Sequence, residues 1–284
     1  MTSRAWIHSA TARLEAGGAD SPRRTAEWML EDLAGIPRVE LYARPHRSLS
    51  PEVLDALDAA VARRVAGEPL QYILGHADFY GLRLRVTPAV LIPRPETEEL
   101  VEVALAELAT RRAPWVLDVG TGSGAIALAI QARRPEAEVF AADVSPAALA
   151  VAQDNAARLQ LDVTFVEADA LRPRFADHVP PAFDLLVSNP PYVPDAERPT
   201  LQRELAHEPA LALFVPDADP LVFYRALGGH AGRLLRPGGC LAVETHADHA
   251  EAVRTLFESG GLSEAVVRDD LSGRPRMVVA RQPA

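Results

Sequence analysis

The chain contains an unusual set of polar and rigid residues at the end of an apolar segment. The run Phe183–Ser188 reads as a buried strand and leads directly into Asn189, Pro190, Pro191 and Tyr192. Such a group offers an amide, stiff backbone carbonyls that accept hydrogen bonds, and an aromatic face. A plain turn is the alternative interpretation, because Asn-Pro often starts turns.

A glycine-rich turn follows another apolar segment, in WVLDVGTGSGAIALAI. Asp118, Gly120, Gly122 and Gly124 lie where a strand is expected to pass into a helix. Glycines allow a tight turn and a close approach of the backbone to a ligand, and the following helix turns its N-terminus toward it. The spacing differs from the dinucleotide motif, and a Walker A loop is excluded because the chain has no lysine.

Acids stand at the ends of the next two expected strands. Asp143 ends EVFAAD, where a carboxylate can accept hydrogen bonds from a ribose diol, and Asp169 ends VTFVEAD. An acid in this position is often only the N-cap of the next helix. Suitable groups on three successive strand ends favour a ligand site.

Strands alternate with helices from residue 96 onward, which predicts an α/β fold with a doubly wound, mostly parallel sheet of seven strands. The expected helices are 96–112, 123–133, 146–158, 218–235 and 247–259. The expected strands are 115–119, 138–142, 162–166, 183–188, 239–244 and a pair within 263–280. Ligands of such sheets bind beyond the carboxyl ends of the strands, where the residues named above lie.

The first part of the chain has a helical pattern. Ser3, Ser21 and Ser50 are expected N-caps, and Trp28 is expected on an apolar helix face. We therefore predict a helical substrate-docking domain over 1–70, with a packing appendage as the alternative. A linker with a β-hairpin is expected over 71–95, and the α/β domain over 96–284.

Composition narrows the function classes. The 284 residues carry a formal net charge of -10, which argues against stable binding of nucleic acid through phosphate neutralisation. All 29 basic residues are arginine, so lysine chemistry is excluded. The single cysteine, Cys240, permits no internal disulfide, and no metal site is expected. Without a secretion signal or an apolar run of membrane-spanning length, a cytoplasmic protein is expected.

The combined motifs resemble those of a known family. DVGTGSG, the acids ending the next two strands and NPPY resemble S-adenosylmethionine-dependent methyltransferases that modify amide or amino nitrogen. EPLQYILG, FYGL, VLIPRPETEELVE, NPPYV and DLSGRPR further resemble the bacterial methyltransferase that modifies the glutamine of peptide chain release factors. The resemblance implies a Rossmann-like methyltransferase fold, S-adenosyl-L-methionine as cofactor, class 1 release factors as protein substrate, and a monomer.

The resemblance also implies roles for residues. The expected catalytic residues are Asn189, Pro190, Pro191 and Tyr192. The expected cofactor-binding residues are Asp118, Gly120, Thr121, Gly122, Ser123, Gly124, Asp143, Asp169, Ala170 and Asn189. The expected substrate-binding residues are the same NPPY group with Phe79, Arg94 and Glu96.

The NPPY group suits this chemistry physically. A primary amide nitrogen is a poor nucleophile because its lone pair is delocalised into the carbonyl. The side-chain oxygen of Asn189 and the carbonyl of Pro190 can accept its two N–H groups, while Tyr192 can lie flat against the amide. Two segments depart from the family pattern, EPALALFVPDADPL and AVETHADHAEA, which leaves their contacts with substrate open.

Other functions remain open at this point. NPPY also occurs in enzymes that methylate the exocyclic amine of adenine in DNA, although the net charge argues against that substrate. A related family methylates a glutamine of a ribosomal protein, and RPETE disfavours it. A catalytically silent binding protein is the alternative outside the enzymes.

Overall fold

The computed structural model describes residues 1–284, and its contacts divide the chain into two units. The N-terminal unit comprises Met1–His76 with Gln202–His207, and the C-terminal unit comprises Ala77–Leu201 with Glu208–Ala284. The inclusion of Gln202–His207 was not predicted. An ion pair of 2.6 Å between Arg64 and Glu204 and a hydrogen bond from Arg203 to the carbonyl of Ala66 join this segment to the end of α4 (Pro51–Val65).

The N-terminal unit is a small helical bundle around the side chains of Trp6, Leu14, Met29, Leu30 and Leu57. Its helices are α1 (Ser3–Ala16), α2 (Pro22–Ala34), α3 (Arg38–Ala43), α4 (Pro51–Val65), α5 (Leu70–Leu74) and the 3₁₀ segment η3 (Arg203–His207).

Four local predictions for this bundle can be compared with the structure. Ser50 caps α4 as expected, accepting from the N–H of Val53. The cap of α1 is Thr2 rather than Ser3, and Ser21 has a left-handed backbone and makes no cap bond. Trp28 is 39% exposed and lies under the guanidinium of Arg24 rather than in the core.

The C-terminal unit contains a seven-stranded sheet in the order β10-β11-β9-β6-β3-β4-β5. The neighbouring pairs from β9 to β5 are parallel, whereas β11 is antiparallel to both β9 and β10. Its strands are β3 (Trp115–Val119), β4 (Glu138–Asp143), β5 (Thr164–Glu167), β6 (Phe183–Ser188), β9 (Leu235–Glu244), β10 (Ser263–Asp269) and β11 (Pro275–Arg281).

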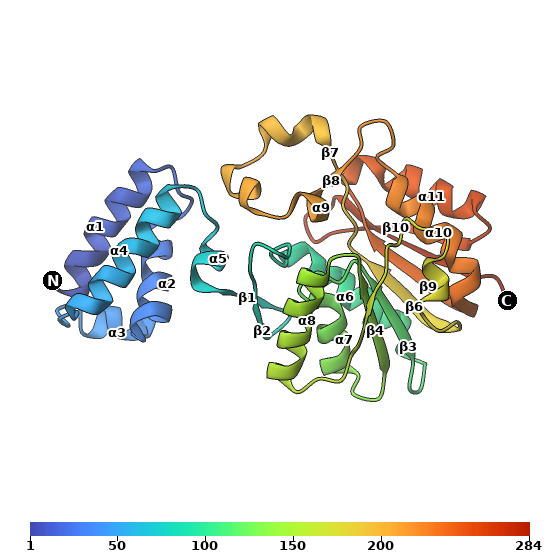
Figure 1. Cartoon of the computed structure of the whole chain (residues 1–284), viewed down its shortest axis with the longest axis horizontal. Coiled ribbons are helices and arrows are strands. Elements are labelled where there is room, and N and C mark those ends of the chain that lie inside the picture. The colour runs from blue at the N-terminus through green and yellow to red at the C-terminus, as the bar shows by residue number, and fades with distance from the viewer. The chain divides into compact units, whose positions relative to one another are not determined.

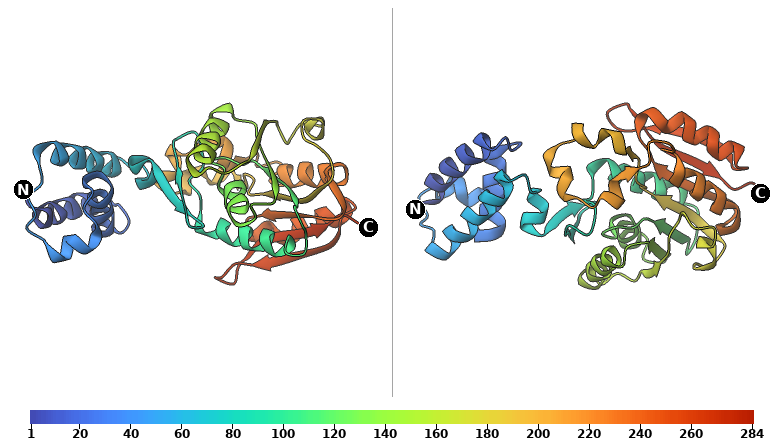
Figure 2. Two further views of the ribbon diagram at one scale, coloured as in Figure 1. Left: turned by 90° about the horizontal axis from the view of Figure 1, so that it is seen from below. Right: turned by 45° about the horizontal axis from the view of Figure 1, so that its top comes forward.

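Helices cover both faces of this sheet, so the predicted doubly wound fold is confirmed (Figures 1 and 2). One core lies under α6 (Pro95–Glu107), α7 (Ala125–Arg133) and α8 (Pro146–Leu159), and the other lies under α10 (Val222–Leu234) and α11 (Ala250–Ser259). All six residues of β6 are buried, as expected for a central strand with helices on both sides. None of the chain's helices is long and apolar enough to cross a membrane.

Shorter elements connect these layers. The expected hairpin is β1 (His76–Phe79) and β2 (Leu82–Arg85), joined by Tyr80 and Gly81, both with positive φ. The remaining elements are β7 (Val193–Pro194), β8 (Phe214–Val215), α9 (Ala210–Leu213) and the 3₁₀ segments η1 (Phe175–Asp177), η2 (Asp195–Thr200) and η4 (Ala247–His249). The helix expected over 96–112 ends at Glu107, and the one expected over 218–235 begins at Val222.

Candidate active site

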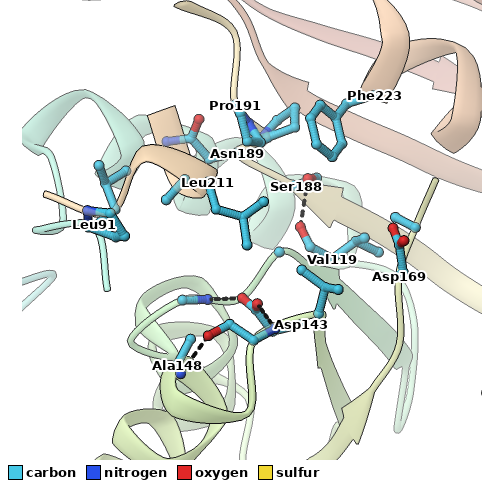
Figure 3. Close-up of a pocket in the computed structure, with 18 of the residues that line it drawn as sticks. Leu91, Val119, Asp143, Ala148, Asp169, Ser188, Asn189, Pro191, Leu211 and Phe223 are labelled. Atoms are coloured by element: carbon cyan, nitrogen blue, oxygen red, sulfur yellow. Dashed lines mark hydrogen bonds between the residues drawn. The ribbon is translucent and has the colours of Figure 1, made fainter. Parts of the chain in front are cut away.

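A cavity of about 250 Å³ lies at the carboxyl ends of the parallel strands, within the C-terminal unit. Figure 3 shows Asn189 and Pro191 on one side of it and Asp143 and Ala148 on the opposite side, with Leu211 between them. The cavity is bounded mainly by Ala89–Leu91, Val119, Gly120, Gly122, Asp143–Ser145, Ala148, Ala168–Leu171, Ser188–Pro191, Pro209, Leu211, Ala212, Phe223 and Leu227.

The glycine turn between β3 and α7 forms one wall. Gly120 and Gly122 have φ values of 75° and 56°, a left-handed conformation that other residues adopt only with strain. A Cβ on either residue would meet no atom within 4 Å, so their missing side chains leave free space beside the cavity. The N–H groups of Gly120 and Thr121 both donate to the carbonyl of Ala142, which ties the turn to the end of β4.

Asp143 links this turn to the next strand. One of its carboxylate oxygens accepts from the N–H of Gly122 and the other from that of Ser145, both at 2.9 Å. A carboxylate has about four acceptor positions, so acceptor capacity remains for two further donors. Burial raises the pKa of Asp143, and the backbone N–H groups of Ser145, Gly122 and Val144 oppose this shift.

Asp118 lies beneath the turn rather than in the wall of the cavity. Its Oδ2 accepts from the hydroxyl of Thr121 at 2.7 Å and from the N–H of Ala127 at 3.2 Å, so it joins the turn to the start of α7. Its Oδ1 is buried and accepts no hydrogen bond. Burial raises the pKa of Asp118 to about 7.

The segment after β5 forms another wall. Asp169 accepts from the N–H of Leu171 at 2.9 Å and from Arg172, so its carboxylate organises the turn while lining the cavity. The carbonyl of Ala170 is hydrogen-bonded to the imidazole of His230 on α10 at 3.0 Å. Val144 and Leu171 are each about two-fifths exposed and add apolar surface at this end.

Asn189 connects to a buried chain of hydrogen bonds at the end of β6. Its Nδ2 donates to the hydroxyl of Thr97 at 2.9 Å, and that hydroxyl donates to Glu244 Oε2 at 2.7 Å. Glu244 Oε1 accepts from the hydroxyl of Tyr192 at 3.2 Å. Thr97 and Glu244 are 4% and 1% exposed, so this group is shielded from solvent. We call Asn189, Thr97, Glu244 and Tyr192 the amide network.

The RPETE motif anchors several segments around the cavity. Arg94 forms an ion pair of 2.5 Å with Glu208, whose other oxygen accepts from the N–H of Ile92 at 3.0 Å. This pair joins the segment before α6 to the segment that carries Pro209 and Leu211. Glu96 is exposed, and its expected contact with substrate stays a prediction.

Several expected site residues lie away from the cavity. Phe79 is 1% exposed and belongs to the core under α6, α7 and α8. Tyr192 packs against the core under α10 and α11 and turns its hydroxyl to Glu244. Thr121 and Ser123 are buried behind the turn, where the carbonyl of Ser123 accepts from Asn155. The stacking role of Tyr192 and the substrate contact of Phe79 stay predictions.

Sequence reasoning did not single out four polar residues of this region: Thr97, Ser188, Glu208 and Glu244. Ser188 donates to the carbonyl of Val119 at 2.6 Å and so holds β6 to β3 at the cavity (Figure 3). A signal existed for Glu244, since a charged residue ends the otherwise apolar run CLAVE. Thr97 lay within a recognised motif, but its partners are 92 and 147 residues away.

Two solved structures share the fold of the C-terminal unit. A methyltransferase from Pyrococcus furiosus has a TM-score of 0.51 at 18% identity, covering 78% of this chain and 98% of that one. A 16S rRNA methyltransferase from Thermus thermophilus, solved with AdoMet and guanosine, has a TM-score of 0.51 at 20% identity, covering 73% of this chain and 49% of that one. The fold is that of the Rossmann-like methyltransferases.

Two family models match the chain: "PrmC N-terminal domain" over residues 5–75 and "Methyltransferase small domain" over 98–216. A release factor glutamine methyltransferase from Chlorobaculum tepidum is 46% identical over 258 residues, covering 88% of this chain and 87% of that protein. Proteins of the same name from Moorella thermoacetica and Deinococcus radiodurans are 43% and 41% identical and cover 99% of this chain, with 98% and 99% of their own lengths matched.

The chain therefore belongs to the release factor glutamine methyltransferase family. The predicted family, the fold class and the cofactor S-adenosyl-L-methionine are confirmed.

Proposed function

We propose that this chain transfers the methyl group of S-adenosyl-L-methionine to the side-chain amide nitrogen of the glutamine in the Gly-Gly-Gln motif of class 1 peptide chain release factors, which tunes translation termination. The supporting observation is that Asn189 and Pro190 line the same cavity as the glycine turn and Asp143. The names of the relatives support the choice of substrate.

The residues around the cavity fit the cofactor. Gly120 and Gly122 leave open space at the turn, and Asp143 has unused acceptor positions for a ribose diol. Leu171 and Val144 provide apolar surface for a purine, next to Asp169 and the backbone of Ala170. Transfer would form an N–CH3 bond as the sulfonium S–CH3 bond breaks, which would leave the cofactor as its neutral thioether, and the amide nitrogen would release one proton to solvent. Because the sulfonium already activates the methyl group, no metal and no strong base is required of the protein.

Asp143 provides the test of this cofactor assignment. Asp143→Ala is expected to weaken binding of S-adenosyl-L-methionine by about 1.5 to 3 kcal/mol, because hydrogen bonds to a charged group contribute on that scale. Titration calorimetry measures the change, and Glu138→Ala, at the exposed start of the same strand, is the matched control. Equal affinities for the two variants would refute the assignment.

Asn189 and Pro190 are proposed to hold the substrate amide. With Nδ2 of Asn189 engaged by Thr97, the side chain keeps Oδ1 as an acceptor for one N–H of the glutamine. The carbonyl of Pro190 accepts the other. These acceptors orient the nitrogen toward the methyl group and oppose delocalisation of its lone pair. Alignment of two reactants can lower a barrier by about 7 to 11 kcal/mol.

Apolar residues are proposed to keep water from the reacting groups. Pro191, Leu211 and Phe223 surround the side of the cavity that contains Asn189 (Figure 3). Leu211 is 59% exposed, and a bound substrate would cover it. Exclusion of water strengthens the hydrogen bonds that hold the substrate.

The N-terminal unit is proposed as the docking module for the protein substrate. It contains no catalytic group, but it presents Val39 and Tyr42 on α3 with exposures of 73% and 57%. Removing residues 1–70 is expected to preserve cofactor affinity and to raise the KM for full-length release factor. A KM equal to that of the full chain, measured on truncated protein with a normal circular dichroism spectrum, would exclude the docking role.

A cytoplasmic location, a monomeric state and the lack of stable nucleic-acid binding are part of the same proposal. Release factors act during translation, and the formal charge of -10 repels nucleic acid. Light scattering of the purified chain at micromolar concentration tests the oligomeric state. A mass of one chain is expected.

The substrate is tested by supplying labelled cofactor with a release factor, a ribosomal protein and DNA in parallel. Peptide mapping should locate the label on the single glutamine of the Gly-Gly-Gln motif. A release factor in which that glutamine is replaced by asparagine should remain unlabelled. Labelling of the ribosomal protein or of DNA at a comparable rate would contradict the proposal.

A further inference from the structure

The amide network settles which way the side chain of Asn189 is turned. A carboxamide can be rotated by 180° about its last bond with almost no change of shape, which exchanges an acceptor for a donor. For Asn189 one orientation presents an acceptor to the substrate and the other presents a donor, and only the acceptor Oδ1 can receive an N–H of a substrate amide. A group that selects one orientation therefore contributes to catalysis without touching the substrate.

The selection follows from the chemistry of Glu244. An ionised carboxylate only accepts hydrogen bonds, so when Glu244 is ionised the single hydroxyl proton of Thr97 points to its Oε2 at 2.7 Å. The Thr97 hydroxyl oxygen can then only accept a hydrogen bond from Asn189. Nδ2 of Asn189 donates to it at 2.9 Å, and no donor in the chain occupies Oδ1.

Glu244 is itself held in place by two tyrosines. Its Oε1 accepts from the hydroxyl of Tyr192, and its backbone carbonyl accepts from the hydroxyl of Tyr224, both at 3.2 Å. Glu244 does not line the cavity, which excludes direct contact with a small substrate group there. Its hydrogen bonds connect it to the cavity through Thr97 and Asn189.

We propose that Thr97, fixed by Glu244, is a positioning residue that turns the Asn189 amide so that Oδ1, and not Nδ2, meets the substrate nitrogen. This inference rests on the proposed function, in which Asn189 is an acceptor. It also explains why the RPETE and NPPY motifs belong together: the first supplies Thr97, which orients the amide of the second.

A purely structural role for Thr97 makes a different prediction. If the network only satisfied buried polar groups, removal of the Thr97 hydroxyl would lower stability and leave the rate of the folded enzyme unchanged. The positioning role requires a loss of rate that depends on Asn189. Thr97→Val removes the hydroxyl at nearly constant volume, and Thr97→Ser keeps the hydroxyl and serves as the matched control.

The experiment is a single-turnover measurement at saturating cofactor and release factor with both Thr97 variants, each made in the natural chain and in Asn189→Ala. In the natural chain, Thr97→Val is expected to slow methyl transfer about tenfold, the scale of losing one neutral hydrogen bond. Thr97→Ser should remain within about threefold. In the Asn189→Ala background, Thr97→Val should change the rate less than twofold. Calorimetry should show that each Thr97 variant binds cofactor as tightly as the chain in which it was made.

The outcomes separate this inference from the proposed function. If Asn189→Ala itself transfers methyl normally, the proposed function of Asn189 fails. If Asn189→Ala is slow but Thr97→Val is not, Asn189 is the acceptor and the positioning role is overturned. A tenfold effect of Thr97→Val in both backgrounds also overturns it, because Thr97 would then act independently of Asn189.

Discussion

Glu27 in the N-terminal unit and Glu244 in the C-terminal unit are both almost completely buried, with exposures of 3% and 1%, but their partners differ in kind. Glu27 accepts from Arg23 and Arg38 at 3.1 and 3.0 Å and from Tyr42 at 2.7 Å. Glu244 accepts only from hydroxyl groups, those of Thr97 and Tyr192.

The difference in partners leads to different protonation behaviour. Burial raises the pKa of Glu27, but the hydrogen bonds from Tyr42 and the two arginines outweigh it, and the pKa lies below its usual value. Burial raises the pKa of Glu244, and its hydroxyl partners do not reverse the shift. Charged partners thus make Glu27 a structural link between α2 and α3, whereas hydroxyl partners let Glu244 direct the protons of a network.

Replacement of Glu244 should affect the reaction more than the fold. Glu244→Gln keeps the shape but lets either an oxygen or an N–H group face Thr97, so the direction of the Thr97 hydroxyl is no longer fixed. We expect the single-turnover rate to fall about fivefold to tenfold, with cofactor affinity unchanged. An unaltered rate would mean that Glu244, like Glu27, has only a structural role.

The pH dependence of the single-turnover rate also tests the role of Glu244. Glu244 is an acid with a raised pKa; besides burial, Glu96 raises it, while Arg276 opposes. Protonated Glu244 no longer requires the Thr97 hydroxyl to donate to it. Single-turnover rates should therefore fall as the pH is lowered through this raised pKa and level off above it.

Thr97→Val is the control for the pH profile. Its rate is expected to be low at every pH, without the acid-side decline that the natural chain shows. If Thr97→Val shows the same loss of rate at low pH, that loss must come from protonation of another group, such as Asp143, whose pKa is also raised by burial.

Replacement of Glu27 should have the smallest effect on the reaction. Glu27→Gln removes the charge that pairs with Arg23 and Arg38, both of which are largely exposed. The free energy of unfolding is expected to fall by about 1 kcal/mol, since pairs with exposed partners contribute little. The methyl-transfer rate of the folded enzyme should not change. Denaturant unfolding and single-turnover assays measure the two quantities. A fivefold loss of rate would show that Glu27, like Glu244, affects the reaction.

The sequence predicted the parts of the fold that carry a repeated pattern. Alternating strands and helices from residue 96 predicted the doubly wound sheet, and the strand ends predicted where Gly120, Asp143 and Asn189 lie. The helices α3 and α5, of six and five residues, were missed because they are too short to show a helical period. Ser21 occupies the N-cap position of α2 as predicted, but its left-handed backbone and its missing cap bond could not be predicted from the Ser-Pro pair.

The polar contacts of the site were less accessible from sequence. The expected contact of Arg94 with substrate stays a prediction, and its ion pair with Glu208, 114 residues away, could not be predicted from local sequence. Glu244 and Thr97 meet across 147 residues, and nothing local in either segment specifies the other. Local pattern places a residue at a strand or helix end, whereas tertiary packing decides which side chain it meets there.

The central claim is that Asn189 accepts a hydrogen bond from the substrate amide, and single-turnover methyl transfer by Asn189→Ala at saturating cofactor tests it most directly. The variant should fold and bind cofactor, because the change removes one side chain at the cavity wall and leaves the hydrogen bond from Thr97 to Glu244 in place. Its rate should fall about a hundredfold to a thousandfold, the scale of removing one preorganised hydrogen-bonding group from an active site. Asn189→Asp, which keeps an acceptor, should retain part of the activity. A rate for Asn189→Ala within threefold of the natural chain would contradict the account and leave Asn189 as a turn residue.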